Sequence, residues 1–80
     1  MLSQLKDKKK MVGTKQAKKA VVNGNAEIVF IAKDADTHIV NFLVDLCNKE
    51  SVKIVYVNTM KELGKACGID VGAASAVLLK

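Results

Sequence analysis

Two β-prone runs on either side of a helix-like stretch constrain the fold of this chain more than any other feature. Residues 27–32 and residues 52–57 have the length of strands and are rich in Ile, Val, Phe and Tyr. Runs of this kind are typical of strands covered on both faces. Between them, Ile39 and Leu43 recur at helical spacing behind Asp36, a candidate N-cap. The pattern predicts buried strands with a helix packed against them.

The rest of the chain continues this alternation of helix and strand. We expect a short helix over residues 2–9, a brief strand at 11–12, a helix over 14–22, a helix that starts at the capping box 59–62, and a final strand over 74–79. Gly24 follows the helix over 14–22 and predicts a left-handed turn there. Strict alternation predicts an α/β/α sandwich whose sheet is mostly parallel, with room for one antiparallel strand.

The length of 80 residues leaves room for one domain, residues 1–80. A domain of this size buries only ~60% of its unfolded surface, so a large catalytic cavity is not expected. The longest apolar run, residues 28–32, is far shorter than the ~18 residues of a membrane span. The basic N-terminus lacks the apolar stretch of a signal peptide. We therefore expect a cytoplasmic monomer with no membrane partner.

Positive charge gathers at one end of the chain. Residues 1–19 hold seven lysines and one acid, a net charge of +6, whereas residues 20–80 hold six lysines and seven acids. Such a field attracts a polyanion, either a nucleic acid or an anionic membrane, unless the lysines form a tail that only aids solubility. Every cation is a lysine, so any base recognition must come from Lys, Gln or Asn.

The sequence offers no complete catalytic constellation. Cys47 and Cys67 fall within apolar helical patterns, which predicts two buried free thiols. His38 is expected on the surface at a helix start, and Asp34 and Asp36 are spaced for capping and turn stabilisation. We expect no metal, no cofactor and no enzyme activity, and the pattern favours a binding module.

Two segments carry the more specific signals. In residues 13–19, Gly13 allows close backbone approach, and the helix start behind it suits a phosphate. Lys15, Gln16 and Lys19 share one face of that helix. Residues 69–71, here called the apolar loop, place two aliphatic side chains in a loop bounded by glycines. They are suited to packing on an unstacked base, although one of them would also fit as a plug of the core.

Three stretches together resemble a known family. Residues 13–19 (Gly-Thr-Lys-Gln, then Lys19), 31–36 (Ile-Ala-Lys-Asp-Ala-Asp) and 62–74 (Glu-Leu-Gly-Lys-Ala-Cys-Gly-Ile-Asp-Val-Gly-Ala-Ala) look like those of the kink-turn RNA-binding ribosomal proteins. These are the large-subunit proteins of the seven-Ae and thirty-e type, with relatives in box C/D and H/ACA particles. The resemblance covers about residues 11–79 and is greatest for the short bacterial members.

The resemblance implies a three-layer α/β/α sandwich with a four-stranded mixed sheet. It also implies recognition of a kink-turn or kink-loop, a sharply bent RNA held by tandem sheared G·A pairs, in ribosomal RNA, a regulatory leader or a ribonuclease P-type RNA. The RNA-binding residues that it implies are Gly13, Thr14, Lys15, Gln16, Lys19, Lys33, Lys65, Ile69, Asp70, Val71, Gly72, Ala73 and Ala74.

The resemblance also implies a role for each group. Residues 15, 16 and 19 reach the guanine edges, residues 13 and 14 lie against phosphate, and the apolar loop covers the extruded nucleotide. Residues 72–74 leave room for the RNA backbone. Lys33 and Lys65 contact phosphate, and Asp34 orients a nearby lysine.

This chain departs from the family pattern at two places. Many members carry Asn-Glu where this chain has Lys15-Gln16, so a neutral amide replaces a carboxylate acceptor for guanine N–H donors. Thr37 stands where the family has a proline, which affects only the start of a helix. Two other hypotheses stay open: a protein-interaction module that uses the apolar loop as a docking patch, and a small enzyme that uses Cys47 or the Asp34–Asp36 pair.

Overall fold

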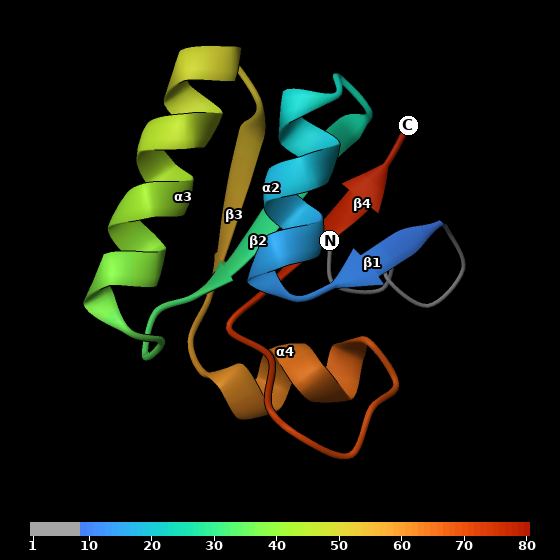
Figure 1. Ribbon diagram of the computed structural model, residues 1–80. Helices are drawn as coiled ribbons and strands as arrows, with labels where there is room; N and C mark the ends of the chain where they lie inside the picture. The colour runs from blue at the N-terminus through green and yellow to red at the C-terminus, as the bar shows by residue number, and fades with distance from the viewer. Residues whose placement is uncertain (1–8) are drawn as a thin grey trace.

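The computed structural model describes residues 9–80, in which helices cover both faces of a four-stranded sheet (Figure 1). The elements follow in the order β1 (Lys10–Val12), α2 (Thr14–Val22), β2 (Ala26–Ala32), α3 (Thr37–Glu50), β3 (Lys53–Val57), α4 (Met60–Ala66) and β4 (Ser75–Leu79). The expected α/β/α sandwich with a mixed sheet is confirmed. The helix expected over residues 2–9 lies outside the described residues. Within residues 9–80, no helix is both long and apolar enough to cross a lipid bilayer.

The sheet has the strand order β1-β4-β2-β3. β2 and β3 pair in parallel, whereas β4 pairs antiparallel with both β1 and β2. Three strands therefore run in one direction and β4 is the single antiparallel member. This agrees with the expected sheet that has one antiparallel strand, and because β4 occupies a central position, two of the three pairings are antiparallel.

The two faces of the sheet are covered by different helices, because successive strand residues point to opposite sides. In β2, Val29 and Ile31 join the apolar cluster formed with α2 and α3. Ile28, Phe30 and Ala32 join the cluster formed with α4 on the other face. β2 is therefore buried on both faces, as predicted, whereas the same prediction for residues 52–57 is wrong, because β3 lies at the edge of the sheet and most of its residues are exposed or half-buried.

Side-chain caps start α3 and α4 where the sequence predicts them. The Asp36 carboxylate accepts the His38 backbone N–H at 2.8 Å. The Thr59 hydroxyl accepts the Glu62 backbone N–H at 3.0 Å. Each cap of this type contributes about 1 kcal/mol to stability. Gly24 has a φ of +75°, so the predicted left-handed turn after α2 is also confirmed.

α3 ends at its C-cap Ser51, a residue type that is not a typical signal for the end of a helix. Ser51 has a φ of +58°, and the Val52 backbone N–H donates to the Cys47 carbonyl at 2.8 Å. A residue other than glycine is uncommon in this region of backbone conformation. The turn leads directly into β3, whose pairing with β2 holds it in place.

α4 packs directly against the chain that follows it. Gly64 is buried, and a Cβ atom at this position would collide with the backbone carbonyl of Val71. The Ile69 backbone N–H donates to the Gly64 carbonyl at 3.1 Å. The apolar loop is thus held against the helix that precedes it.

We expect Gly64→Ala to lower the free energy of unfolding by about 1–3 kcal/mol, because the added methyl group must displace loop backbone. Lys65→Ala, at an exposed position of the same helix, is the matched control and should change it by less than about 0.5 kcal/mol. Urea unfolding followed by circular dichroism measures both. Equal stability of the two variants would show that the loop does not pack on α4.

Candidate functional site

All three helices described here begin at one end of the sheet (Figure 1). β1, β2 and β3 run toward this end, each is followed by one of the helices, and β4 starts from it. We call it the helix-start end. Helix N-termini carry unsatisfied N–H groups and a partial positive charge. The helix-start end therefore favours anions.

α2 differs from the other two helices because no side chain accepts a hydrogen bond from its first backbone N–H groups. Its N-cap is Gly13, which makes no side-chain cap hydrogen bond, and its first intrahelical bond runs from the Ala17 N–H to the Gly13 carbonyl at 2.9 Å. Gly13 has a φ of +111°, a conformation that side-chain-bearing residues rarely adopt. The backbone N–H groups of residues 14–16 are thereby left to an external acceptor.

Ser75, the first residue of β4, holds the start of α2 in place. Its carbonyl accepts the Gly13 N–H at 2.9 Å, and its hydroxyl lies 3.0 Å from the Thr14 hydroxyl. Ser75 is fully buried and is the buried polar residue of the described core. The apolar loop leads into Ser75 through residues 72–74, so the strand that follows the loop is joined to the α2 start at the helix-start end.

The loop is anchored on both sides of its exposed residues. The Ala73 N–H donates to the Met60 carbonyl at 3.0 Å, and the Ala74 carbonyl accepts the Ala32 N–H at 2.9 Å. Ala73 is buried, and a Cβ atom at Gly72 would lie 3.1 Å from the Met60 Cβ. A side chain at position 72 would therefore be a tight fit against Met60, and Ala73 packs within the core.

Both aliphatic side chains of the apolar loop lie on the surface. Val71 is 70% exposed and Ile69 is 36% exposed, with the exposed Asp70 between them. Val71 does not plug the core, so that alternative is excluded. Apolar surface that is fixed in place and unused in packing is typical of a binding site.

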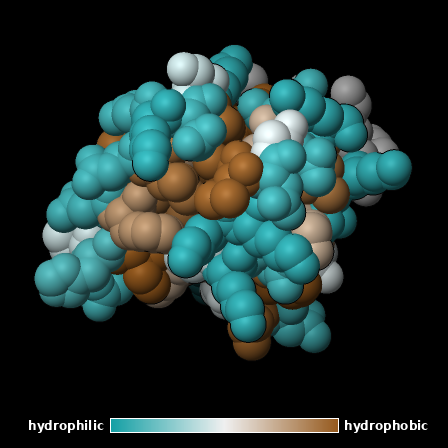
Figure 2. Space-filling view, turned by 45° about the horizontal axis from the view of Figure 1, so that its top comes forward, coloured by the Kyte–Doolittle hydropathy of each residue, from teal (hydrophilic) through white to brown (hydrophobic). Residues whose placement is uncertain are grey.

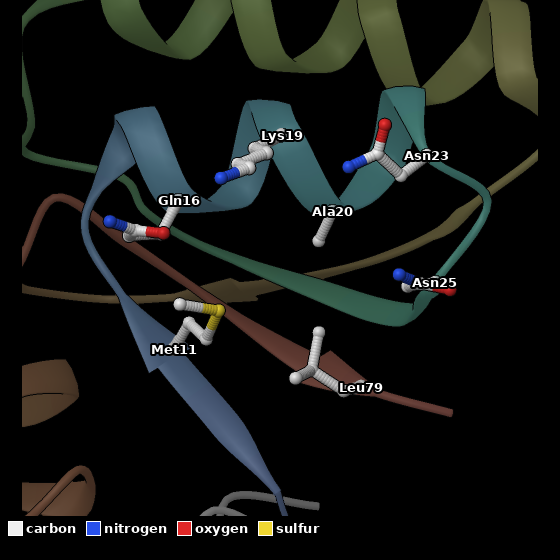
Figure 3. Close-up of a pocket in the computed structure, with 7 residues that line it drawn as sticks. All are labelled: Met11, Gln16, Lys19, Ala20, Asn23, Asn25 and Leu79. Carbon is white, nitrogen blue, oxygen red and sulfur yellow. The ribbon is translucent and has the colours of Figure 1, made fainter.

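The predicted face of α2 is divided between two hollows that share Lys19. Gln16 and Lys19 line a groove between α2 and the edge of the sheet (Figure 3). Lys15 and Lys19 line a second hollow on the outer side of the helix, together with Val22. Lys15 and Lys19 are exposed, whereas Gln16 is half-buried.

Lysine and apolar surface also meet between α2 and α3. The Lys18 ammonium lies 5.7 Å from the centre of the Phe42 ring, within the range of a cation–π interaction. Val22 and Phe42 are both more than one third exposed. Figure 2 shows apolar surface gathered in a patch that hydrophilic residues border. Lys18 is thus held toward α3, away from the face that carries Gln16.

Lys33, Asp34 and Lys65 lie around the same end of the molecule. Lys33 is exposed directly after β2, and its N–H donates to the Val57 carbonyl at 2.8 Å. Lys65 is exposed in the last turn of α4. The Asp34 carboxylate accepts the Met60 backbone N–H at 2.8 Å. Asp34 therefore binds the start of α4. The resemblance had instead implied that Asp34 orients a nearby lysine.

The described residues offer little for catalysis. Cys47 and Cys67 are free and buried, as predicted, and burial raises the pKa of both thiols. For Cys67, the nearby Lys10 ammonium opposes part of this rise in pKa. His38 is exposed at the start of α3. Within residues 9–80, no group of three or more His, Cys, Asp and Glu side chains is placed to hold a metal ion.

Sequence reasoning missed Ser75 as a member of this site. The only signal in the sequence is the hydroxyl of Ser75 at the start of an otherwise apolar strand. A buried hydroxyl requires a hydrogen-bond partner, so burial of Ser75 implies one. The partner, Thr14, is 61 positions away along the chain, and no local pattern identifies it.

Comparison with known proteins gives a consistent result. The family model described as the ribosomal protein L7Ae/L30e/S12e/Gadd45 family matches residues 2–80. A protein named as an RNA-binding protein from Caldanaerobacter subterraneus subsp. tengcongensis is 54% identical over 68 residues, 85% of this chain and 83% of the relative. The large ribosomal subunit protein eL8 of Halobacterium salinarum is 41% identical over 68 residues, 84% of this chain and 57% of its own length.

Solved structures share the fold. The 15.5 kD RNA-binding protein of Giardia lamblia is 36% identical with a TM-score of 0.84, covering 89% of this chain and 60% of that protein. A Bacillus halodurans protein, described as being of unknown function, is 26% identical with a TM-score of 0.88, covering 99% of this chain and 83% of that one.

We expect both cysteines to resist iodoacetamide at pH 8 in the native protein and to react in urea, because burial keeps the thiols protonated. A raised pKa in the folded state means that stability falls as the pH rises through and above the ordinary thiol range of about 8.5. Mass spectrometry of labelled protein measures the reactivity. Rapid native labelling of Cys47 or Cys67 would revive the enzyme hypothesis.

We expect Thr14→Val and Ser75→Ala to be energetically coupled by about 0.5–1.5 kcal/mol, the usual contribution of one hydrogen bond. A double-mutant cycle on the free energy of unfolding measures this coupling. Thr37→Val, at the exposed start of α3, replaces Thr14→Val in the control cycle and should show no coupling to Ser75→Ala. Additive effects of Thr14→Val and Ser75→Ala would contradict the role given to the hydroxyl pair.

Proposed function

Because this chain belongs to the ribosomal protein L7Ae/L30e/S12e/Gadd45 family, we propose that it binds RNA and recognises a kink-turn or kink-loop through tandem sheared G·A pairs. Relatives named as RNA-binding proteins support the RNA partner. The observation that carries the proposal is the joint at Ser75, which brings the start of α2 and the apolar loop to one end of the molecule. We place this activity in the cytoplasm and give the protein no catalytic step.

In this proposal, the start of α2 enters the major groove that the kink opens. The major groove of regular A-form RNA is too narrow for side chains, so a bend is needed to admit a helix. Lys15 and Lys19 donate to guanine O6 and N7, while Gln16 both donates and accepts at base edges. The open N–H groups behind Gly13, with the Thr14 hydroxyl, bind a phosphate.

The apolar loop covers the nucleotide that the kink extrudes. Ile69 and Val71 present aliphatic surface to the face of the base, and the bonds at Ala73 and Ala74 hold that surface in position. Lys33 and Lys65 contact the RNA backbone on either side. Contacts of this kind set position and make affinity fall with salt, but they carry no base selectivity.

We expect Lys19→Ala to weaken binding of a kink-turn RNA by about 1–3 kcal/mol, roughly 5- to 150-fold, and to relax the preference for G·A pairs. Lys49→Ala is the matched control, because it removes the same charge from an exposed site in the last turn of α3, far from the helix-start end. Binding titrations at one fixed salt concentration should use the kink-turn RNA and a straight duplex of equal length.

Two outcomes would overturn the proposal. One is equal affinity of the wild-type protein for the kink-turn and the straight duplex. The other is hydrogen exchange in which saturating RNA leaves Ile69 and Val71 unprotected while a protein partner protects them. That second outcome would favour the protein-docking hypothesis for the apolar loop.

A further inference from the structure

A groove beside α2 extends beyond the contacts assigned to RNA above. It is lined by Met11, Gln16, Lys19, Asn23, Asn25 and Leu79 (Figure 3). We propose that this α2 groove holds one unpaired nucleotide of the RNA, next to the kinked element. The inference rests on the proposed function and adds a second nucleotide site, distinct from the one at the apolar loop.

The groove is continuous with the proposed RNA surface. Gln16 and Lys19 line one part of it, and both belong to the face of α2 that reads the kinked groove. Asn23 lies seven positions after Gln16, about 10 Å further along the helix axis. An RNA strand held at the start of α2 therefore has a direct path into the groove.

The floor of the groove is apolar and comes from two neighbouring strands. Met11 of β1 and Leu79 of β4 point toward α2 in Figure 3. The Met11 side chain is 38% exposed, so it is accessible to a ligand in the groove. A thioether and an aliphatic side chain together suit the flat face of a base, because methionine sulfur makes favourable contacts with aromatic rings.

The walls of the groove present amides on a fixed backbone. The Asn23 N–H donates to the Lys19 carbonyl at 3.0 Å and the Asn25 N–H donates to the Ala20 carbonyl at 2.9 Å. The side-chain hydrogen bonds found among residues 9–80 do not involve these two asparagines. Each amide offers donors and an acceptor, which match the edge of a base and the ribose 2′-hydroxyl.

Charge and size select among occupants. Lys19 lines the groove and no Asp or Glu side chain does. The groove is therefore suited to the negative charge of a nucleotide phosphate. The groove has a volume of about 150 Å³. Pockets for free small molecules usually measure roughly 300–1,000 Å³, so this groove is suited to a single base attached to a longer strand.

The test uses the full chain and a kink-turn RNA that carries 4-thiouridine at each unpaired position in turn. We expect one position to crosslink to Met11, Asn23 or Asn25, located by tandem mass spectrometry within the tryptic peptides 11–15 and 20–33, because these peptides also carry residues 13–15 and 33 of the proposed RNA surface. A different position should crosslink to peptide 66–80, which contains the apolar loop. Crosslinks confined to peptide 66–80 would overturn the inference.

Affinity provides an independent measurement. We expect Asn23→Ala and Met11→Ala each to weaken binding of the kink-turn RNA about two- to tenfold, while Asn48→Ala, at an exposed site in α3, leaves binding unchanged. If the wild-type protein prefers the kink-turn to a straight duplex but both groove variants bind like wild type, only the groove assignment fails. If the wild-type protein shows no such preference, the proposed function fails as well.

Discussion

The bonds made by Ser75 hold together the end of the molecule on which the proposed function depends. Its carbonyl receives the Gly13 N–H and its hydroxyl meets that of Thr14, so one buried residue ties the start of α2 to the strand that follows the apolar loop. Because the partners are 61 positions apart, this joint exists only through the insertion of β4 between β1 and β2. The strand that follows the apolar loop is therefore bonded directly to the helix start.

The electrostatics of the helix-start end follow from how each helix is capped. Asp36 and Thr59 occupy the first N–H groups of α3 and α4, and Asp34 accepts the Met60 N–H. At α2 the cap is a glycine, and the first turn holds Lys15 and no acidic residue. The open positive end thus lies on the same helix as Lys15, Gln16 and Lys19, the residues to which the proposed function gives base contacts.

Much of the fold follows from local patterns. The apolar run of β2 predicted a strand buried on both faces, and the caps of α3 and α4 stand where Asp36 and Thr59 indicated. Burial of Cys47 and Cys67 was predicted from helical spacing. The end of α3 at Ser51 was less visible, because its left-handed backbone is imposed by the turn into β3. The central position of the one antiparallel strand was not predicted, because alternating elements indicate crossovers but not the position that the last strand takes.

The sequence by itself determined the class of fold, the open start of α2 and the presence of aliphatic residues in a glycine-bounded loop, since each depends on neighbours along the chain. Tertiary structure decided that Val71 faces solvent, that Gly64 is needed for packing, and that Ser75 joins β4 to α2. Tertiary structure also formed the α2 groove, because its floor joins Met11 near one end of the chain to Leu79 at the other. Contacts between distant segments depend on the position of β4 in the sheet, and no local periodicity encodes that position.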